Sequence, residues 1–420
     1  MMKKKSKRPW GVFIAIALAI VFGTLVGDSR EIFGIKIFSI LDVIGILFLN
    51  ALTLVVVPLV SSSIIVGISR IGGEEGFKRI GAKMFSFYIG TTLLAILIGL
   101  LFVNLIGPGY QFGSVPTADI ANLSKELNTS SSSILNVLLS IIPANIVNAL
   151  SQGNMLGLIF FSGFFGFCIS KIEEHNRATL RSFFTGLFQV MIQFTHLIMK
   201  FLPIGVFCLV AKVFMTTGLE SLASVALFTL TVLLGLVAFM FVGLPLLVKT
   251  LAKVSPIRLF KAMSPALITA FSTSSSSATI PVTIDCVEKR AGVSNRICSL
   301  VVPLGTSMNM SGSALYECVA AMFVAQAYGI ELTMMKQFLI VVLALITSIG
   351  VAGIPSASLV AVLLILKVIG LPLEGIGLFI AVDRILDMCR TTVNVFSDSC
   401  CAVLVAKSEG EKNVLTSDEY

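Results

Sequence analysis

The chain has 420 residues, of which 56% are hydrophobic and 12% are charged, whereas soluble domains carry about 25% charged residues. This composition excludes an intrinsically disordered chain and argues against a soluble enzyme, because one soluble core would not cover 31 phenylalanines. The formal net charge is +8, and the charged residues lie between the apolar runs. We therefore attribute the basic excess to membrane orientation and expect no nucleic-acid binding.

Six apolar runs of membrane-spanning length lie in the N-terminal part of the chain. The first follows basic residues at 3–8 and is expected to be an uncleaved helix, because no cleavage site precedes a polar mature domain. The fourth is too long for one straight helix, and Pro143 with Gly153 predicts a break in it. The runs cover residues 12–26, 37–69, 84–106, 133–170, 183–211 and 223–248.

Two later apolar segments, 257–286 and 337–366, have polar or helix-breaking centres, FSTSSSSATIP and GVAGIPSAS. Their half-helices are too short to cross a bilayer, and irregular backbone at that depth persists only beside protein or water. We therefore predict two re-entrant helical hairpins. A full span follows each, at 296–327 and 371–406, and this repetition with opposite orientation is typical of secondary transporters. The predicted fold is an all-α integral membrane protein with eight transmembrane helices, two re-entrant hairpins and inverted repeats.

The distribution of Lys and Arg supports this topology, because short cytoplasmic loops retain these residues. With a cytoplasmic N-terminus, 21 of the 30 fall in inside segments, six in outside segments and three within spans. Two ordinary spans in place of the hairpins would break this pattern. We therefore expect both termini to be cytoplasmic.

The last span carries a polar stripe. At 100° per residue its members fall within about 80°, and such a stripe cannot face lipid. Three carboxylates beside one Arg leave negative charge that calls for cations; the alternative is a set of charges that neutralise one another between helices. The stripe consists of Asp383, Asp387, Arg390, Asn394 and Asp398.

The preceding span contains GTSMNMSGSALYE at 305–317, with two Gly and no charge before Glu317, and it is expected to unwind. Exposed carbonyls with Asn309 and Asp398 would form an all-oxygen site, the ligand set that hard cations prefer. Close packing on a neighbouring helix is the alternative explanation for the two glycines.

Four segments in order resemble the signature segments of the dicarboxylate/amino acid:cation symporters, the family of archaeal aspartate transporters and animal excitatory amino-acid transporters. The resemblance covers about 255–410, and the first six runs agree only in number and pattern. The segments are SSSSATIPVT (274–283), PLGTSMNMSGSALYE (303–317), AGIPSAS (352–358) and DRILDMCRTTVNVFSD (383–398).

The resemblance implies that Arg390 binds a side-chain carboxylate and Asp387 an α-ammonium group. Relatives that carry dicarboxylates without an amine usually lack an acidic residue at the position of Asp387, so its presence favours an amino acid. The implied substrate-binding residues are Ser275, Ser276, Ser277, Asp387, Arg390, Thr391 and Asn394.

The resemblance also implies sodium sites, one of them between the broken helix and the second hairpin. No covalent cofactor is expected, and Na⁺, H⁺ or both would be the coupling ions. The implied ligands of the other two sites are Gly305, Asn309, Asn394 and Asp398 in one, and Tyr88, Thr91 and Thr92 in the other.

Three departures from the family pattern predict altered ion coupling around a retained substrate site. Ser311 stands where the family nearly always has an aspartate of the third cation site. Glu317 matches animal members, in which this position is linked to proton coupling. Ser274 and Met388 occupy the positions where a second arginine is usual.

The expected organisation has a scaffold and oligomerisation region at 1–254, a transport core at 255–410 and a cytoplasmic tail at 411–420, with disorder over 408–420. Spans 3 and 6 are expected to move with the core. The resemblance implies a homotrimer, surrounded by membrane lipid, in the cell membrane, here a bacterial inner membrane.

The expected function is secondary symport of an acidic amino acid, glutamate or aspartate, into the cell with sodium, protons or both. A C4-dicarboxylate:cation symporter and an ion channel are the alternatives. An enzyme is not expected, because the sequence has no HExxH or GxSxG motif. The eight cysteines lack a CxxC pair, so neither a disulfide framework nor a metal site is expected.

Overall fold

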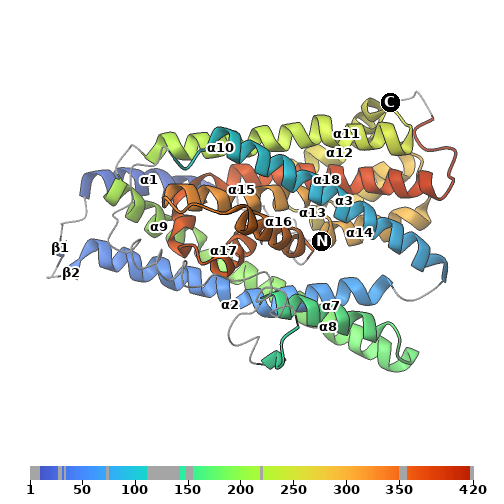
Figure 1. The fold of residues 1–420 in the computed structure, drawn as a ribbon, viewed down its shortest axis with the longest axis horizontal. Coiled ribbons are helices and arrows are strands. Elements are labelled where there is room, and N and C mark those ends of the chain that lie inside the picture. Colours follow the sequence, from blue (N-terminus) through green and yellow to red (C-terminus); the bar gives the residue numbers. More distant parts are fainter. Residues whose placement is uncertain are drawn as a thin grey trace, which may run out of the picture.

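The protein, seen here as a computed structural model, is an elongated bundle of helices (Figure 1). Within the described ranges the only strands are β1 (Glu31–Ile32) and β2 (Ile35–Lys36), which pair antiparallel. The predicted all-helical class is therefore confirmed apart from this short hairpin. The structure describes residues 10–26, 31–32, 35–71, 75–110, 142–147, 155–217, 221–349 and 357–416.

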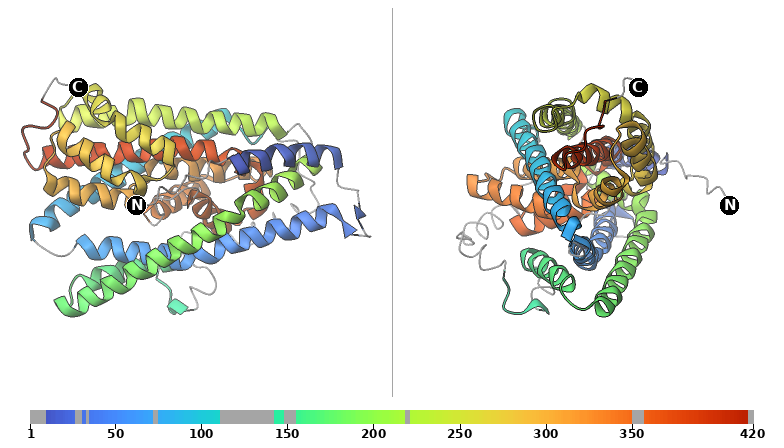
Figure 2. Two further views of the ribbon diagram at one scale, coloured as in Figure 1. Left: turned by 180° about the vertical axis from the view of Figure 1, so that it is seen from behind. Right: turned by 90° about the vertical axis from the view of Figure 1, so that its right-hand side faces the viewer.

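Five N-terminal helices form one side of the bundle (Figures 1 and 2). Helix α1 packs along α9, and α2 packs along α7, α8 and α9. The predicted break within 133–170 falls partly outside the described residues, and α7 is its C-terminal part. These helices are α1 (Trp10–Val26), α2 (Ile37–Ile71), α7 (Met155–Ile169), α8 (Glu174–Ile198) and α9 (Leu202–Thr217).

The run predicted at 183–211 consists of two helices, because the 3₁₀ turn η1 (Met199–Phe201) separates α8 from α9. Pro203 lies in the first turn of α9. A proline is tolerated there, since its missing N–H would have no partner within the helix. The predicted run is therefore a continuous helical segment with a 3₁₀ turn inside it.

Two helices in the described part of the chain are long and apolar enough to cross a membrane, over Arg79–Ile106 and Ala223–Ala252. The first belongs to α3 (Glu75–Ile106). The second begins in α10 (Ser221–Ala238) and continues through η3 (Phe239–Gly243), α11 (Leu244–Leu247) and η4 (Val248–Ala252). Helix α3 packs against α10 and α15, which places it beside the C-terminal elements.

The first predicted hairpin is a helix–turn–helix of α12 (Pro256–Thr273) and α13 (Ser276–Asp285), followed by the π-helical turn η5 (Cys286–Arg290). Ser274 adopts a left-handed conformation with φ of 50° and ends α12. The Ser275 hydroxyl then accepts a hydrogen bond from the Ala278 N–H at 3.2 Å and caps α13. The polar centre thus forms the turn.

The second hairpin consists of α16 (Met334–Ser348) and α17 (Ala357–Ile369), which pack against each other. Its predicted tip at 350–356 lies outside the described residues. The helix that follows is preceded by the 3₁₀ segment η6 (Leu373–Leu378) and is α18 (Ile380–Ser408).

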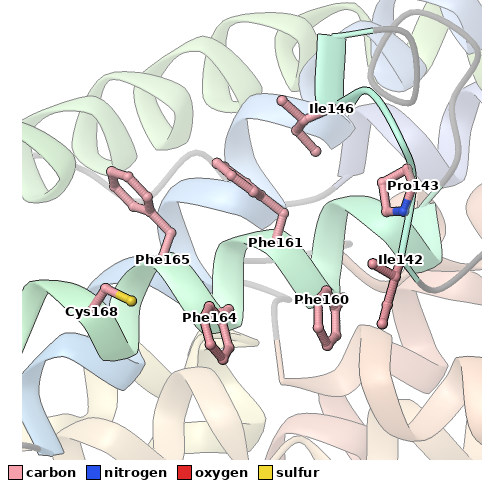
Figure 3. A pocket seen from close by; sticks show the side chains of 8 residues that line it. All are labelled: Ile142, Pro143, Ile146, Phe160, Phe161, Phe164, Phe165 and Cys168. Carbon is pink, nitrogen blue, oxygen red and sulfur yellow. The ribbon is translucent and has the colours of Figure 1, made fainter.

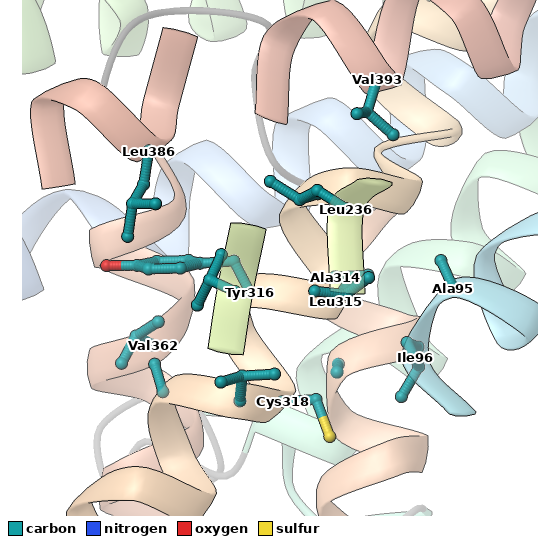
Figure 4. Packing of buried hydrophobic residues seen from close by; sticks show 14 of the residues in the cluster. Ala95, Ile96, Leu236, Ala314, Leu315, Tyr316, Cys318, Val362, Leu386 and Val393 are labelled. Carbon is teal, nitrogen blue, oxygen red and sulfur yellow. The ribbon is translucent and has the colours of Figure 1, made fainter. Parts of the chain in front are cut away.

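The unwinding predicted within 296–327 is confirmed. Helix α14 (Asn295–Met308) ends, Asn309 and Met310 have non-helical dihedral angles, and α15 (Ser311–Ala327) begins. Every residue of α15 is buried. Figure 4 shows the Tyr316 ring of α15 between Leu386 of α18 and Val362 of α17. Helix α15 is therefore the centre of the core.

The expected disorder over 408–420 is wrong for residues 409–416. The Leu415 N–H donates to the Ala291 carbonyl at 2.9 Å, and Val414 is buried. Glu411 accepts hydrogen bonds from the Ser294 N–H and hydroxyl. This segment therefore packs on the loop between η5 and α14. Residues 417–420 lie outside the described part.

Glu409 ties the end of α18 to the start of α3. Its carboxylate accepts a hydrogen bond from Arg79 Nε at 3.2 Å and one from Lys83 Nζ at 2.6 Å. These bonds, chiefly that from Arg79, hold the pKa of Glu409 below its usual value. The carboxylate therefore stabilises the fold above its usual pKa of about 4.3, and this stabilisation is lost as the pH falls through the lower folded-state value.

Glu409→Gln is expected to lower the thermal unfolding midpoint in detergent near neutral pH, because Arg79 and Lys83 lose their carboxylate. The deficit relative to the wild type should shrink as the pH falls below about 4, where the wild-type carboxylate is protonated as well. Glu331→Gln, at an exposed glutamate, is the matched control and should leave the midpoint unchanged. A deficit that stays constant with pH would contradict this role of Glu409.

Candidate functional site

Arg390 lies at the centre of the polar stripe of α18 and is wholly buried. Its Nη2 donates to Asp383 Oδ1 at 2.9 Å and to Asp387 Oδ1 at 3.0 Å. Its Cζ lies 3.7 Å from the centroid of the Tyr316 ring, a cation–π contact. Arg390 Nε and Nη1 are buried without a hydrogen-bond partner. The guanidinium therefore retains donors for an anion.

A second arginine, which the stripe did not include, contacts one of these carboxylates, that of Asp387. Arg384 Nη1 lies 3.6 Å from Asp387 Oδ2. Helical periodicity places Arg384 beside the stripe, but the i,i+3 spacing to Asp387 brings the two side chains together. The expected surplus of two negative charges is therefore reduced to one, because two guanidiniums balance Asp383 and Asp387 and leave Asp398.

Asn394 has a role that sequence reasoning missed. Its Oδ1 accepts hydrogen bonds from the N–H groups of Gly312 at 2.8 Å and Ser313 at 3.3 Å, and its Nδ2 donates to the Ser313 hydroxyl at 3.1 Å. The first N–H groups of a helix have no partner within it. The Asn394 side chain thus caps α15, while Thr391, one turn earlier, is buried on the same helix.

The predicted third cation cluster is brought together by α3. Asn309 Oδ1 lies 3.0 Å from the Thr91 hydroxyl, 3.4 Å from that of Thr92 and 3.0 Å from that of Ser311. Ser311 also lies 3.2 Å from Thr92 and 3.1 Å from Ser397, hydroxyl to hydroxyl. The cluster is therefore lined by neutral oxygens.

Tyr88 faces another part of the broken helix. Its hydroxyl donates to the Val301 carbonyl at 2.5 Å. No hydrogen bond from Tyr88 to Asn309 is found among the described residues, so Tyr88 fixes α3 against α14 beside the cluster.

Asp398 of α18 lies on the other side of Asn309, away from this neutral cluster. The Asn309 Nδ2 group donates to Asp398 Oδ1 at 2.9 Å and to the Ser397 hydroxyl at 3.1 Å. Asp398 Oδ2 is buried without a hydrogen-bond partner. A Cβ at Gly305 would lie 2.4 Å from Asp398 Oδ1, so only glycine allows this approach. The carboxylate and the nearby backbone fit the oxygen ligands of a hard cation, whereas Asn309 presents its amide nitrogen to Asp398 and its oxygen to Thr91 and Ser311.

Glu317 lies one helical turn beyond Ser313 on α15 and is wholly buried. Its Oε2 accepts a hydrogen bond from the Thr347 hydroxyl of α16 at 2.7 Å, and its Oε1 has no hydrogen-bond partner. This carboxyl group thus sits between α15 and the second hairpin.

The serines of the first hairpin differ in their surroundings. Ser276 is buried, Ser275 is half-buried and Ser277 is exposed. Helix α13, which they begin, packs against α18. The structure therefore places the hairpin turn near the helix that carries Arg390, and the unpaired N–H groups at the start of α13 suit an anion.

The pocket in Figure 3 is lined by residues that are distant in sequence from those described above. Its lining is apolar, with four phenylalanines of α7, and its volume is about 240 Å³. It offers neither charge nor a hydrogen-bond donor to an anion, so it does not qualify as the substrate site. Its lining residues are Ile142, Pro143, Ile146, Phe160, Phe161, Phe164, Phe165 and Cys168.

Comparison with known proteins gives matches over nearly the whole chain. The sequence profile of the sodium:dicarboxylate symporter family matches residues 9–408. The proton/sodium-glutamate symport protein of Bacillus caldotenax is 34% identical, over 98% of this chain and 96% of the relative. The proton/glutamate-aspartate symporter of Escherichia coli (strain K12) is 34% identical, over 97% and 94%.

Excitatory amino acid transporter 3 of Mus musculus is 32% identical, over 94% of this chain and 84% of the relative. The resemblance seen in the four C-terminal segments is therefore confirmed, and the similarity extends through the N-terminal helices as well. This chain belongs to the sodium:dicarboxylate symporter family.

Proposed function

We propose that the chain is a secondary active symporter that moves glutamate or aspartate into the cell together with sodium ions, protons or both. The observation that carries the proposal is the buried guanidinium of Arg390, whose Nε and Nη1 lack hydrogen-bond partners. Each of these nitrogens forms, with Nη2, an edge that a carboxylate can accept, once Nη2 releases the aspartate it now bonds on that side. Relatives named as glutamate symporters support this assignment.

The proposed substrate site extends from Arg390 to Asp387, one turn away on α18. Asp387 would bind the α-ammonium group, Thr391 and Asn394 would lie alongside the substrate, and Ser275 to Ser277 would hold the α-carboxylate at the start of α13. The packing of α13 on α18 supports this arrangement.

The proposed ion coupling follows from the carboxylates that no guanidinium contacts. Asp383 and Asp387 are balanced by Arg384 and Arg390. Asp398 would bind sodium with the Gly305 carbonyl, Asn309 and Asn394. Glu317, buried against the second hairpin, would carry a proton.

The proposed topology has eight transmembrane helices, two re-entrant hairpins and cytoplasmic termini, in a bacterial inner membrane. The hairpin helices α12, α13, α16 and α17 have 18, 10, 15 and 13 residues, whereas a straight membrane-spanning helix needs about 20. Their length supports the re-entrant assignment.

The proposed organisation assigns most of 1–254 to a scaffold that assembles as a homotrimer, and 255–410 to the transport core. The packing of α3 and α10 on α15 and α18 supports their movement with the core. Exposed phenylalanines on α7, among them Phe164 and Phe167, support a face covered by lipid or by a second copy.

Uptake into proteoliposomes tests the function. Radiolabelled aspartate, glutamate and succinate would be offered with sodium and proton gradients imposed separately. Saturable, gradient-driven accumulation of the two amino acids, and exchange of labelled for unlabelled substrate, are expected. Current without amino-acid flux would support a channel instead, and succinate uptake equal to aspartate uptake would contradict the role of Asp387.

The second hairpin is expected to close over the substrate from outside, because its sequence GIPSAS combines a glycine, Gly353, with Pro355, which has no N–H to donate. Ser356→Cys in a Cys168→Ser background, which removes the exposed native thiol, should lose reactivity toward an impermeant external reagent when substrate and cation are added. Met334→Cys, at an exposed position of α16, should label under all conditions. Unchanged labelling at position 356 would argue against an external gate.

A further inference from the structure

Arg384 contacts the carboxylate of Asp387, the group proposed to bind the substrate's ammonium. Asp387 Oδ2 lies 3.6 Å from Arg384 Nη1, while Asp387 Oδ1 lies 3.0 Å from Arg390 Nη2. Each oxygen of Asp387 therefore has its own guanidinium. In the proposed function Arg384 balances the charge of Asp387 but contacts neither substrate nor ion.

The two arginines hold Asp387 in different ways. The Arg390 contact has hydrogen-bond length and its side chain is 0% exposed, whereas the Arg384 contact is longer than a hydrogen bond and its side chain is 21% exposed. A partly exposed guanidinium can exchange its partner for water at little cost. A wholly buried one cannot, because the unpaired charge would stay desolvated. Arg384 is thus the replaceable partner of Asp387.

We propose that Arg384 is a specificity-determining residue that occupies Asp387 whenever the bound ligand has no ammonium group. This inference rests on the proposed function. An amino acid displaces Arg384 from Asp387 with its own ammonium group. A dicarboxylate without an amine leaves Arg384 in place, so the site accepts it as a second, weaker class of ligand.

The effect follows from the charge that Asp387 retains when Arg390 turns toward a ligand carboxylate. The Asp387 side chain is only 6% exposed, and burying a carboxylate without a cation is costly. An amino acid brings the missing cation with it. A dicarboxylate does not, so removing Arg384 penalises the dicarboxylate alone.

The test compares the wild type with Arg384→Gln and Arg384→Lys in proteoliposomes. Aspartate affinity comes from its own uptake, and succinate affinity comes from its inhibition of aspartate uptake. Arg384→Gln is expected to raise the ratio of the succinate constant to the aspartate constant by about tenfold, which corresponds to about 1.4 kcal/mol. Arg384→Lys retains a cation and should keep the ratio within about twofold to threefold of the wild type.

Each possible result either supports or contradicts the proposed role of Arg384. An unchanged ratio in Arg384→Gln, with aspartate still transported, would overturn the role of Arg384 and leave the proposed function intact. Succinate that fails to inhibit the wild type at tens of millimolar would overturn it as well. A wild type that transports neither glutamate nor aspartate would instead overturn the proposed function. A general loss of packing in Arg384→Gln would weaken the binding of both ligands alike, so it could not by itself raise the ratio.

Discussion

Arg390→Ala is expected to abolish measurable uptake of glutamate and aspartate. The substrate carboxylate loses a charge-assisted pair of hydrogen bonds worth about 1.5 to 3 kcal/mol or more, so affinity should fall by at least about tenfold. Asp383 and Asp387 also lose the cation that now bridges them, and their mutual repulsion would distort the site further. Uptake of radiolabelled substrate into proteoliposomes measures the effect.

A second variant separates binding from folding in this experiment. Asp387 keeps its contact with Arg384 in Arg390→Ala, whereas Asp383 loses its arginine. Asp383→Asn combined with Arg390→Ala removes that buried charge, which should restore much of the thermal unfolding midpoint. Uptake should remain absent in this double variant. If Arg390→Ala transports glutamate with unchanged affinity, the assignment of the carboxylate to Arg390 is wrong.

The second large effect concerns the ions. The hydrogen-bond partners of the Ser311 hydroxyl among the described residues are the neutral side chains of Thr92, Asn309 and Ser397. A sodium ion there would lack a counter-charge, so we expect fewer than three sodium ions per transport cycle. Ser311→Asp should raise sodium affinity, and the dependence of uptake on sodium concentration should become steeper.

Glu317 should supply the remaining coupling through a proton. Glu317→Gln keeps a hydrogen-bond acceptor for Thr347, which now bonds Oε2 at 2.7 Å, but cannot exchange a proton. Uptake driven by a pH gradient alone should disappear in this variant, while sodium-driven uptake persists. Steep dependence of the wild type on three sodium ions, together with unaltered pH sensitivity in Glu317→Gln, would contradict this account of coupling.

Most helices could be predicted because long apolar runs, hairpin centres and breaks have strong local signals. Residues 309 and 310 unwind where small and polar residues interrupt an apolar span. Thr91 and Thr92 meet Asn309, which the resemblance assigns to a different sodium site. Periodicity alone would not have predicted that α3 packs against the broken helix. It indicates which face of a helix is buried, but not which helix covers that face.

Three features were missed, two because they depend on tertiary contacts and one, the pairing of Arg384 with Asp387, although its i,i+3 spacing is a local signal. Asn394 caps α15, which lies far away in sequence. Arg384 reaches Asp387 from outside the polar stripe, because side chains one turn apart can meet across its edge. The segment after Ser408 has a polar sequence, and its order comes from the Ala291 carbonyl and other groups of a distant loop.

The capping of α15 by Asn394 also bears on how the site can move. A Cβ at Gly312 would lie 3.0 Å from the Arg390 carbonyl oxygen and 3.2 Å from Asn394 Oδ1, so the two backbones are already in close contact. Separating α15 from α18 would expose buried N–H groups that have no other partner. The two helices therefore behave as one rigid body, and the groups proposed to bind substrate and ions keep their mutual positions. Access from the two sides of the membrane must then come from displacement of the hairpins, or of this whole block relative to α2, α7 and α8.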